Sequence, residues 1–149
     1  MQRSSIVFSL FVALFFVFAT GCSKSPEQRL TGTWAVDVEA TMDAKAATLE
    51  GEELEEFEAE REEATEQLNS MSMTMTFNAD GTAEMSMTFM DEENTSAGTW
   101  EITSAEGDEM VVAITEEDEE EAEEQTLVFS GNNQFSIEMM NDSVVFARQ

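Results

Sequence analysis

The residues from Met71 to Phe89 read MSMTMTFNADGTAEMSMTF, and the expected architecture follows from this pattern. Large apolar residues alternate with Ser and Thr in two runs, so each run is expected to form a strand with Met and Phe on one face. Between the runs, Asn78 suits the first position of a type I turn and Gly81 can adopt a positive φ. The segment therefore predicts a β-hairpin with one apolar face.

Further short β-prone runs follow the hairpin at regular intervals, separated by Gly, Asn, Asp and Glu. This spacing predicts a meander of antiparallel strands. With a first strand over residues 30–38, the expected number of strands is eight. The expected fold is mainly β, either a small eight-stranded up-and-down barrel, which would remove exposed sheet edges, or a strongly curved meander. The later runs are Gly98–Thr103, Met110–Thr115, Thr126–Phe129, Phe135–Met139 and Val144–Phe146, and residues 91–96 are expected to form a turn.

Residues 41–69, which follow the first strand, differ in character because they are rich in Glu and Ala and contain no Pro. This composition favours an inserted acidic α-helix, which Gly51 is expected to split into a short and a longer part. Leu54, Phe57 and Leu68 fall on one narrow apolar stripe of the longer part. We expect this stripe to dock on the sheet and to offset repulsion between the many Glu side chains. A second interpretation, an acidic arm that binds a partner or attracts cations, stays open.

The first 21 residues have the features of a secretory signal peptide. Arg3 precedes a run from Ile6 to Phe18 that is apolar except for Ser9, and this run is too short for a membrane-spanning helix. It ends in Ala-Thr-Gly before Cys22, which resembles the lipobox of bacterial lipoproteins. The resemblance implies cleavage before Cys22, a diacylglyceryl group on its sulfur and an acyl chain such as palmitate on the new amino terminus. A plain secretory peptide and an uncleaved anchor are the alternatives.

The residue after Cys22 bears on location. Ser23 resembles the pattern of lipoproteins sorted to the outer membrane, since an Asp there often means inner-membrane retention. We therefore expect a protein that is secreted and lipid-anchored to an envelope membrane, with the outer membrane favoured and the domain facing the periplasm or the surface. Residues 22–29 form the expected lipidated terminus and tether, and residues 30–149 form the expected domain.

Three short motifs carry a second resemblance. They are Leu30-Thr-Gly-Thr-Trp34, Thr74-Met-Thr-Phe-Asn-Ala-Asp-Gly-Thr82 and Ala97-Gly-Thr-Trp-Glu-Ile102. Over Leu30 to Arg148 the chain resembles the small lipocalin-like domains of bacterial lipoproteins. The resemblance implies a barrel, with an apolar cavity as one of its forms, and it carries over no catalytic residue. The early helix departs from a classical lipocalin, whose helix follows the barrel.

Charge and missing residue types restrict the chemistry. Asp and Glu number 33 against six Lys and Arg, a formal charge of −27, so a nucleic-acid partner is excluded because phosphate binding needs a basic face. The chain has no His, no Tyr and one Cys, which rules out an intrachain disulfide, a Cys/His metal site and a His-dependent triad. We expect no enzymatic activity, no cofactor and no resident metal, and a solvated loop for the acidic run from Glu116 to Glu124.

The barrel lumen leaves two functional interpretations open, because eight strands enclose just enough space for side chains or for one small ligand. A filled lumen would indicate an envelope interaction or structural protein with an unknown protein partner. A hollow lumen would bind a small hydrophobic molecule, and the flexible Met side chains suit such a site. The candidate ligand-binding residues are Trp34, Met73, Met75, Phe77, Met85, Met87, Phe89 and Trp100, and the other residues expected to point inward are Ile102, Val112, Phe129, Phe135, Ile137 and Phe146.

The Met residues of the hairpin allow a third interpretation. Thioether sulfurs select soft metals such as Cu(I), and five Met residues could face one another across the two strands. Ordinary packing explains the same alternation, and we prefer it. These residues are Met71, Met73, Met75, Met85 and Met87.

The lipid anchor gives the first testable prediction. We expect Cys22→Ala to release the protein from the membrane fraction or to leave the signal peptide uncleaved, because the acylated sulfur is then missing. Membrane fractionation and the mass of the mature chain measure this outcome. Normal membrane partitioning of a correctly cleaved variant would contradict the lipoprotein assignment.

Overall fold

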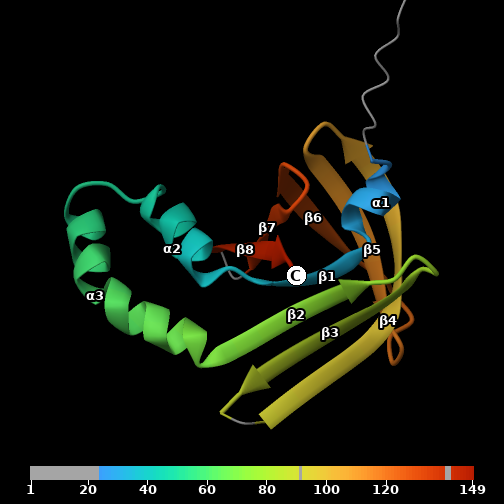
Figure 1. Cartoon of the computed structure of the whole chain (residues 1–149), viewed down its shortest axis with the longest axis horizontal. Coiled ribbons are helices and arrows are strands. Elements are labelled where there is room, and N and C mark those ends of the chain that lie inside the picture. Colours follow the sequence, from blue (N-terminus) through green and yellow to red (C-terminus); the bar gives the residue numbers. More distant parts are fainter. Residues whose placement is uncertain (1–23, 91, 140–141) are drawn as a thin grey trace, which may run out of the picture.

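The protein is an eight-stranded antiparallel β-barrel with three helices (Figure 1), as a computed structural model of residues 24–90, 92–139 and 142–149 shows. Each strand pairs with the next along the chain, and β8 pairs with β1, so the ladder is closed. The predicted up-and-down barrel is confirmed. The signal peptide and Cys22 lie outside the described residues.

The helices and strands follow the order expected from the sequence, with a short extra helix in front. In chain order they are α1 (Pro26–Leu30), β1 (Gly32–Val36), α2 (Val38–Ala46), α3 (Glu52–Asn69), β2 (Met71–Phe77), β3 (Thr82–Phe89), β4 (Glu92–Glu106), β5 (Glu109–Glu116), β6 (Glu123–Ser130), β7 (Gln134–Met139) and β8 (Asp142–Arg148).

The hairpin β2–β3 forms as its sequence predicts. The Gly81 N–H donates to the Asn78 carbonyl over 3.1 Å, and Gly81 adopts a φ of 86°. The Thr82 carbonyl accepts from the Asn78 N–H over 2.9 Å, which closes the loop. The register places Met75 opposite Met85, so the large apolar residues share the inner face of the barrel.

Several strand boundaries differ from the sequence prediction, since β4 also extends to Glu106 and β6 begins at Glu123; two differences reassign a segment or its element. Residues 92–96, expected in a turn, belong to β4 and pair with Met85 to Phe89 of β3. Hydrogen bonding to β3 stabilises the strand here, despite the low strand propensity of Glu and Asn. Val38, expected in the first strand, instead begins α2, where the Asp37 carboxylate accepts a hydrogen bond from the Ala40 N–H over 3.0 Å and caps the helix.

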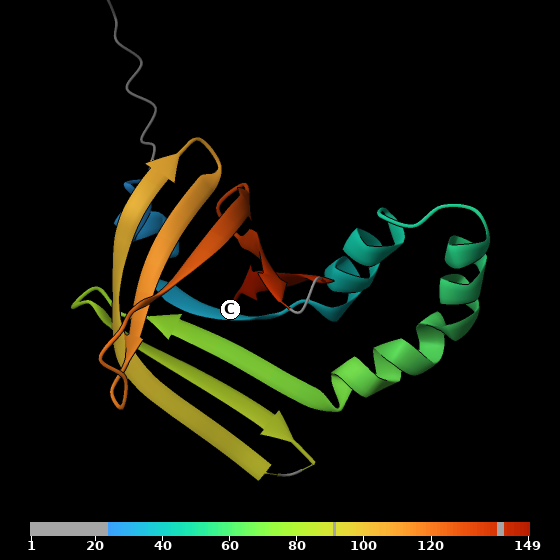
Figure 2. The same cartoon turned by 180° about the vertical axis from the view of Figure 1, so that it is seen from behind.

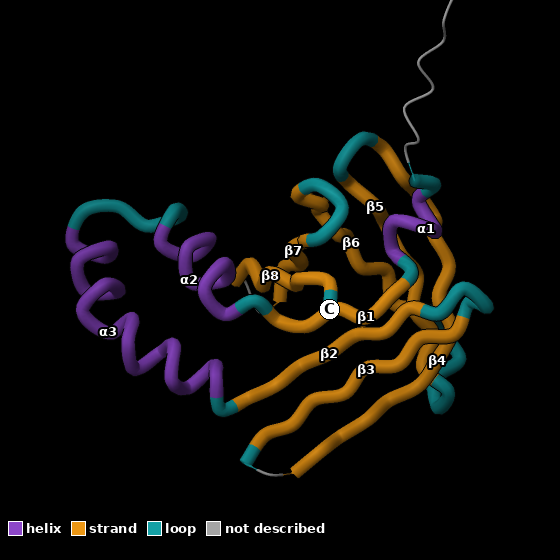
Figure 3. Tube along the Cα trace, in the orientation of Figure 1, coloured by secondary structure: helices purple, strands orange, loops and turns teal. Residues whose placement is uncertain are grey.

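The two ends of the barrel are built differently, because successive turns of an up-and-down barrel alternate between its ends. One end, here called the closed end, carries α1 and the β2–β3, β4–β5 and β6–β7 turns (Figure 3). The opposite end, here called the open end, carries α2, α3 and the turns after β3 and β5. There β2, β3 and the first part of β4 extend beyond their neighbours, and Met87 and Phe89 on this extension are 36% and 43% exposed.

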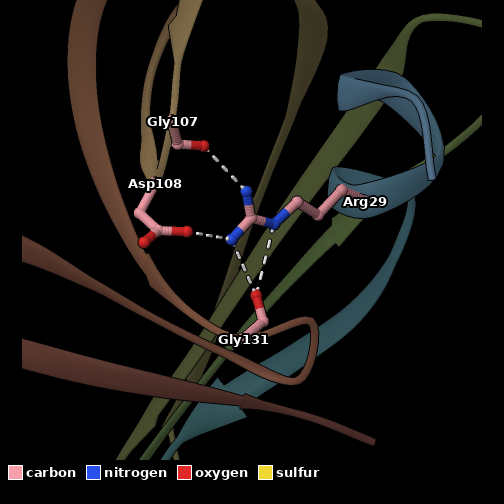
Figure 4. A network of polar contacts seen from close by, with 4 residues as sticks. All are labelled: Arg29, Gly107, Asp108 and Gly131. Atoms are coloured by element: carbon pink, nitrogen blue, oxygen red, sulfur yellow. Dashed lines mark hydrogen bonds and ion pairs between the residues drawn. The ribbon is translucent and has the colours of Figure 1, made fainter. Parts of the chain in front are cut away.

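Helix α1 plugs the closed end. Its Arg29 guanidinium donates to the carbonyls of Gly107 and Gly131 and to the Asp108 carboxylate, and thereby ties the β4–β5 and β6–β7 turns together (Figure 4). The same group lies 4.4 Å from the centre of the Phe129 ring, and Leu30 is fully buried. Residues 26–29, expected in the tether, thus form part of this plug.

Trp34 and Arg148 complete the closed end. The Arg148 guanidinium lies 4.2 Å from the centre of the Trp34 ring and donates to the carbonyls of Thr31 and Arg29. Burial lowers the pKa of Arg148. The Trp34 indole N–H donates to the Leu30 carbonyl over 2.8 Å, so the side chain is fully buried and hydrogen-bonded.

Helices α2 and α3 stand beside the barrel and do not cover its sheet (Figures 1 and 2). Gly51 separates them as predicted, and α2 packs on β8, where the Val145 N–H donates to the Thr41 hydroxyl over 3.0 Å. The predicted stripe is the more covered face of α3, since Leu54, Phe57 and Leu68 are partly buried, but no residue of α3 is fully buried and the expected docking across the sheet is absent. The chain reverses at Gly51, so α3 lies against α2 and the start of β2, and its Glu side chains stay in water.

The charge on α3 gives a second prediction. The helix carries nine Glu and one Arg without a buried anchor, so like-charge repulsion should weaken it in dilute buffer. Helical circular dichroism should increase between 10 mM and 1 M NaCl, as the Debye length falls from about 30 Å to about 3 Å. A variant in which Glu55, Glu56, Glu62 and Glu63 are Gln should lose this dependence. A helical signal independent of salt in the wild type would show that repulsion does not limit α3.

Gly32 gives a third prediction, because it combines a φ of 137° with a close approach to the Arg148 guanidinium. Gly32→Ala should destabilise the fold by more than the roughly 1–2 kcal/mol that a left-handed conformation costs other residues, since Arg148 must leave Trp34. Gly107→Ala is the matched control: its φ is 61°, and open space surrounds the added methyl group. Thermal unfolding measures both, and equal losses would contradict the role assigned to Arg148.

Candidate functional site

A cavity of about 170 Å³ lies inside the barrel towards the open end. Its wall is mainly apolar and is formed by inward-facing side chains of β2, β3, β5 and β7. The large apolar side chains in this wall are Met75, Phe77, Met85, Ile114, Ile137 and Met139.

Small residues on β3 and β4 leave this space open. Ala83 and Gly98 pair with each other in the ladder and lie on the inner face beside Phe77, and Ser96 lies opposite Met85 on the same face. Most other inward positions carry larger side chains, which are apolar in the core and acidic or amide-bearing near the cavity mouth. The cavity therefore exists because three adjacent inward positions carry small side chains or none.

Gly98 is required at its position for a second reason. A methyl group there would collide with the Thr115 carbonyl on β5. The backbones of β4 and β5 approach closely at this point, where Gly98 pairs with Glu116. Glycine thus both permits this approach and widens the lumen.

The half of the lumen near the closed end is filled by aromatic side chains. The rings of Phe135 and Phe146 stack with their centres 5.3 Å apart, and Trp34 packs against Phe135 at 4.7 Å and against Phe129 at 6.0 Å. All four side chains are at most 4% exposed. Both expectations for the lumen hold in part, since one half is ordinary core and the other half is hollow.

The mouth of the cavity is acidic. Glu116, Glu119 and Glu123 line it, together with Gln125 and Glu84. Among residues 24–90, 92–139 and 142–149, no ion pair reaches these carboxylates, and no three acidic or Cys side chains are placed to hold one metal ion. The cavity thus joins an apolar interior to a rim of uncompensated negative charge.

The structure brings together three of the eight candidate ligand-binding residues. Met75, Phe77 and Met85 line the cavity. Trp34 belongs to the core at the closed end, and Trp100 packs edge-on against Phe77 at 5.7 Å, with its indole N–H donating to the Asn78 carbonyl. The remaining three, Met73, Met87 and Phe89, lie on the inner face of the extended strands and do not line the cavity.

Some lining residues were missing from the candidate set. Ile114, Ile137 and Met139 could have been found from alternation along their own strands, and Ile137 was indeed expected to point inward. The acidic rim was missed because the expected strands ended at Thr115 and began at Thr126, whereas β5 extends to Glu116 and β6 begins at Glu123. The run that contains them was expected to be a solvated loop.

A second hollow of about 520 Å³ lies on the flank of the barrel, where β6 and β7 separate after three paired positions. Its lining is mainly polar, with Val128 exposed on the outer face. Gln125 and Ile137 line both this hollow and the inner cavity, so the two spaces lie next to each other at these side chains. The inner cavity is the better candidate for an apolar ligand because its wall is apolar.

No model of a known protein family matches this chain, and no curated protein matches it in sequence. Among the residues that the structure describes, no helix combines the length and the apolar character that crossing a bilayer requires.

The two halves of the lumen should respond differently to substitution. Met85→Leu keeps volume and apolar character at a half-buried position, so it should cost less than about 1.5 kcal/mol. Phe135→Ala removes a ring from the packed half and should cost about 3–5 kcal/mol. Urea unfolding of the two variants measures this difference, and similar losses would mean that the open half is packed as tightly as the closed half.

Proposed function

We propose that this protein is a non-catalytic lipoprotein of a bacterial envelope whose barrel binds one small apolar ligand in its open half. The observation that carries the proposal is the apolar cavity of about 170 Å³ formed beside Ala83, Ser96 and Gly98. The lipobox-like sequence at Cys22 and the lipocalin-like motifs support the same assignment.

The size of the cavity limits the ligand. A dry cavity of about 150 Å³ can bind benzene, whereas pockets for drug-sized ligands measure about 300–1,000 Å³. The cavity is thus suited to an apolar group of about six carbon atoms. The flexible Met side chains in its wall allow modest adjustment to shape.

The position of α1 bears on orientation at the membrane. Only three residues separate Cys22 from Pro26, the first residue of α1, and three extended residues span about 10 Å. A lipid on Cys22 would hold the closed end near the bilayer. The open end, with the cavity mouth, would then face away from the membrane, where a water-borne ligand can reach it.

Two alternative functions are each supported by one observation. The exposed Met87 and Phe89 on the extended strands would suit a protein partner in an envelope interaction role. The register places Met73 opposite Met87 and Met75 opposite Met85, so the thioethers could offer a soft site for Cu(I). We favour ligand binding, because an apolar cavity that opens at one end of the barrel explains the small residues at three inward positions.

Occlusion of the cavity tests the proposal. Protein with ¹³C-labelled Met methyl groups, in lipid nanodiscs, is titrated with 2-phenylethanol against protein-free nanodiscs. The Met75, Met85 and Met139 signals should shift saturably, and that of Met42, buried outside the cavity, should not. Ala83→Phe should abolish the shifts by filling the cavity.

The matched control for this experiment is Ala105→Phe. Ala105 is exposed near the β4–β5 turn, so the same substitution adds the same bulk away from the cavity. This variant should bind as the wild type does. Equal binding by the Ala83 variant, once its fold is verified by circular dichroism, would place the ligand elsewhere and contradict the proposal.

A further inference from the structure

We infer that the cavity selects an organic cation: a small molecule with an apolar group of about six carbons and one ammonium group at its end. The inference rests on the proposed function, because it names the ligand class for the same cavity. It is carried by the change from apolar to acidic side chains along the inward positions of two neighbouring strands.

On β5 this change occurs over three successive inward-facing positions. Val112 is fully buried, Ile114 lines the cavity and Glu116 lines its mouth, and the three alternate along one strand. Since side chains two residues apart lie on the same face, all three point into the barrel. Glu116 is thus on the inner face of β5, and at the end of the strand its side chain is also exposed to solvent.

The adjacent strand β6 repeats the gradient. Leu127 is 2% exposed, Gln125 lines the cavity and Glu123 pairs with Ile114 in the ladder at the mouth. Glu119, in the turn between the strands, lines the same mouth, and its N–H donates to the Glu116 carbonyl over 3.0 Å. Two strands and their turn therefore bring three carboxylates to one rim.

Four of the five cations in the described part of the chain are engaged elsewhere, and the fifth, Lys24, lies just before α1 at the closed end. Arg29 pairs with Asp108, Lys45 pairs with Asp142, and Arg61 pairs with Asp43 and Glu58. Arg148 is held at the closed end over Trp34. Within the described part of the chain, the rim carboxylates thus meet no positive side chain, and a ligand that supplies one gains the attraction.

The geometry also assigns the two parts of the ligand to different places. The apolar group fills the space beside Phe77, Met75 and Met85, and the ammonium group stays at the mouth, where it remains hydrated and close to Glu116, Glu119 and Glu123. A carboxylate in that position would meet three like charges. The cavity should therefore rank ligands of equal size as cation, then neutral molecule, then anion.

Three molecules with the same phenyl group test this order: 2-phenylethylammonium, 2-phenylethanol and phenylacetate. Each is titrated into the whole protein in lipid nanodiscs, and the methyl signals of Met75, Met85 and Met139 report occupancy. In 10 mM salt the cation should bind at least about fivefold more tightly than the alcohol, from one ion pair in water, and phenylacetate should bind more weakly than the alcohol. The preference should shrink in 1 M salt.

A pair of triple variants separates the rim from the overall negative charge. Glu116→Gln, Glu119→Gln and Glu123→Gln together should remove the preference for the cation and leave binding of the alcohol within about twofold. Glu52→Gln, Glu55→Gln and Glu62→Gln on α3 change the net charge equally and should leave the preference intact.

The outcomes distinguish this inference from the proposed function. Binding of all three probes with equal affinity, or a cation preference that survives in the rim variant, would overturn the inference and leave the apolar ligand site standing. Loss of the preference in both triple variants would assign it to overall charge and also overturn the inference. Failure of every probe to shift the three Met signals at millimolar concentration would overturn both proposals.

Discussion

The packing of Trp34 under the Arg148 guanidinium is the interaction on which the barrel depends. Trp34 lies in β1, the strand that pairs with both β2 and β8 and so closes the ladder. Its ring packs on Phe135 and Phe129, and Arg148 covers it and also holds the carbonyls of Thr31 and Arg29. One buried side chain thus joins the first strand, the last strand and the plug that precedes them.

This arrangement makes the barrel asymmetric. Stability is concentrated at the closed end, where aromatic rings fill the lumen and Arg29 ties two turns to α1. The open half is less completely packed, so Ala83 and Gly98 leave part of the lumen hollow and acidic residues occupy inward positions at its mouth. A binding site can exist there because the core on the other side holds the fold together.

The inserted helices fit the same division. They join the barrel through α2, where Thr41 and Lys45 contact β8, and α3 adds no buried residue. A sequence with nine Glu on one helix cannot bury most of its faces, since a buried carboxylate without a partner costs far more than its apolar stripe would gain. The insertion therefore stays beside the open end and does not close it.

The sequence by itself determined the strand order, the hairpin at Asn78–Gly81 and the inner face of each strand, because period-two alternation and turn chemistry are local properties. It also identified Met75, Phe77 and Met85. The tertiary structure alone decided that Met87 and Phe89 remain exposed, that α3 lies off the sheet and that Glu116 and Glu123 meet at one cavity mouth. These features depend on how far each strand extends and on the register between strands distant in sequence, and no local pattern specifies either.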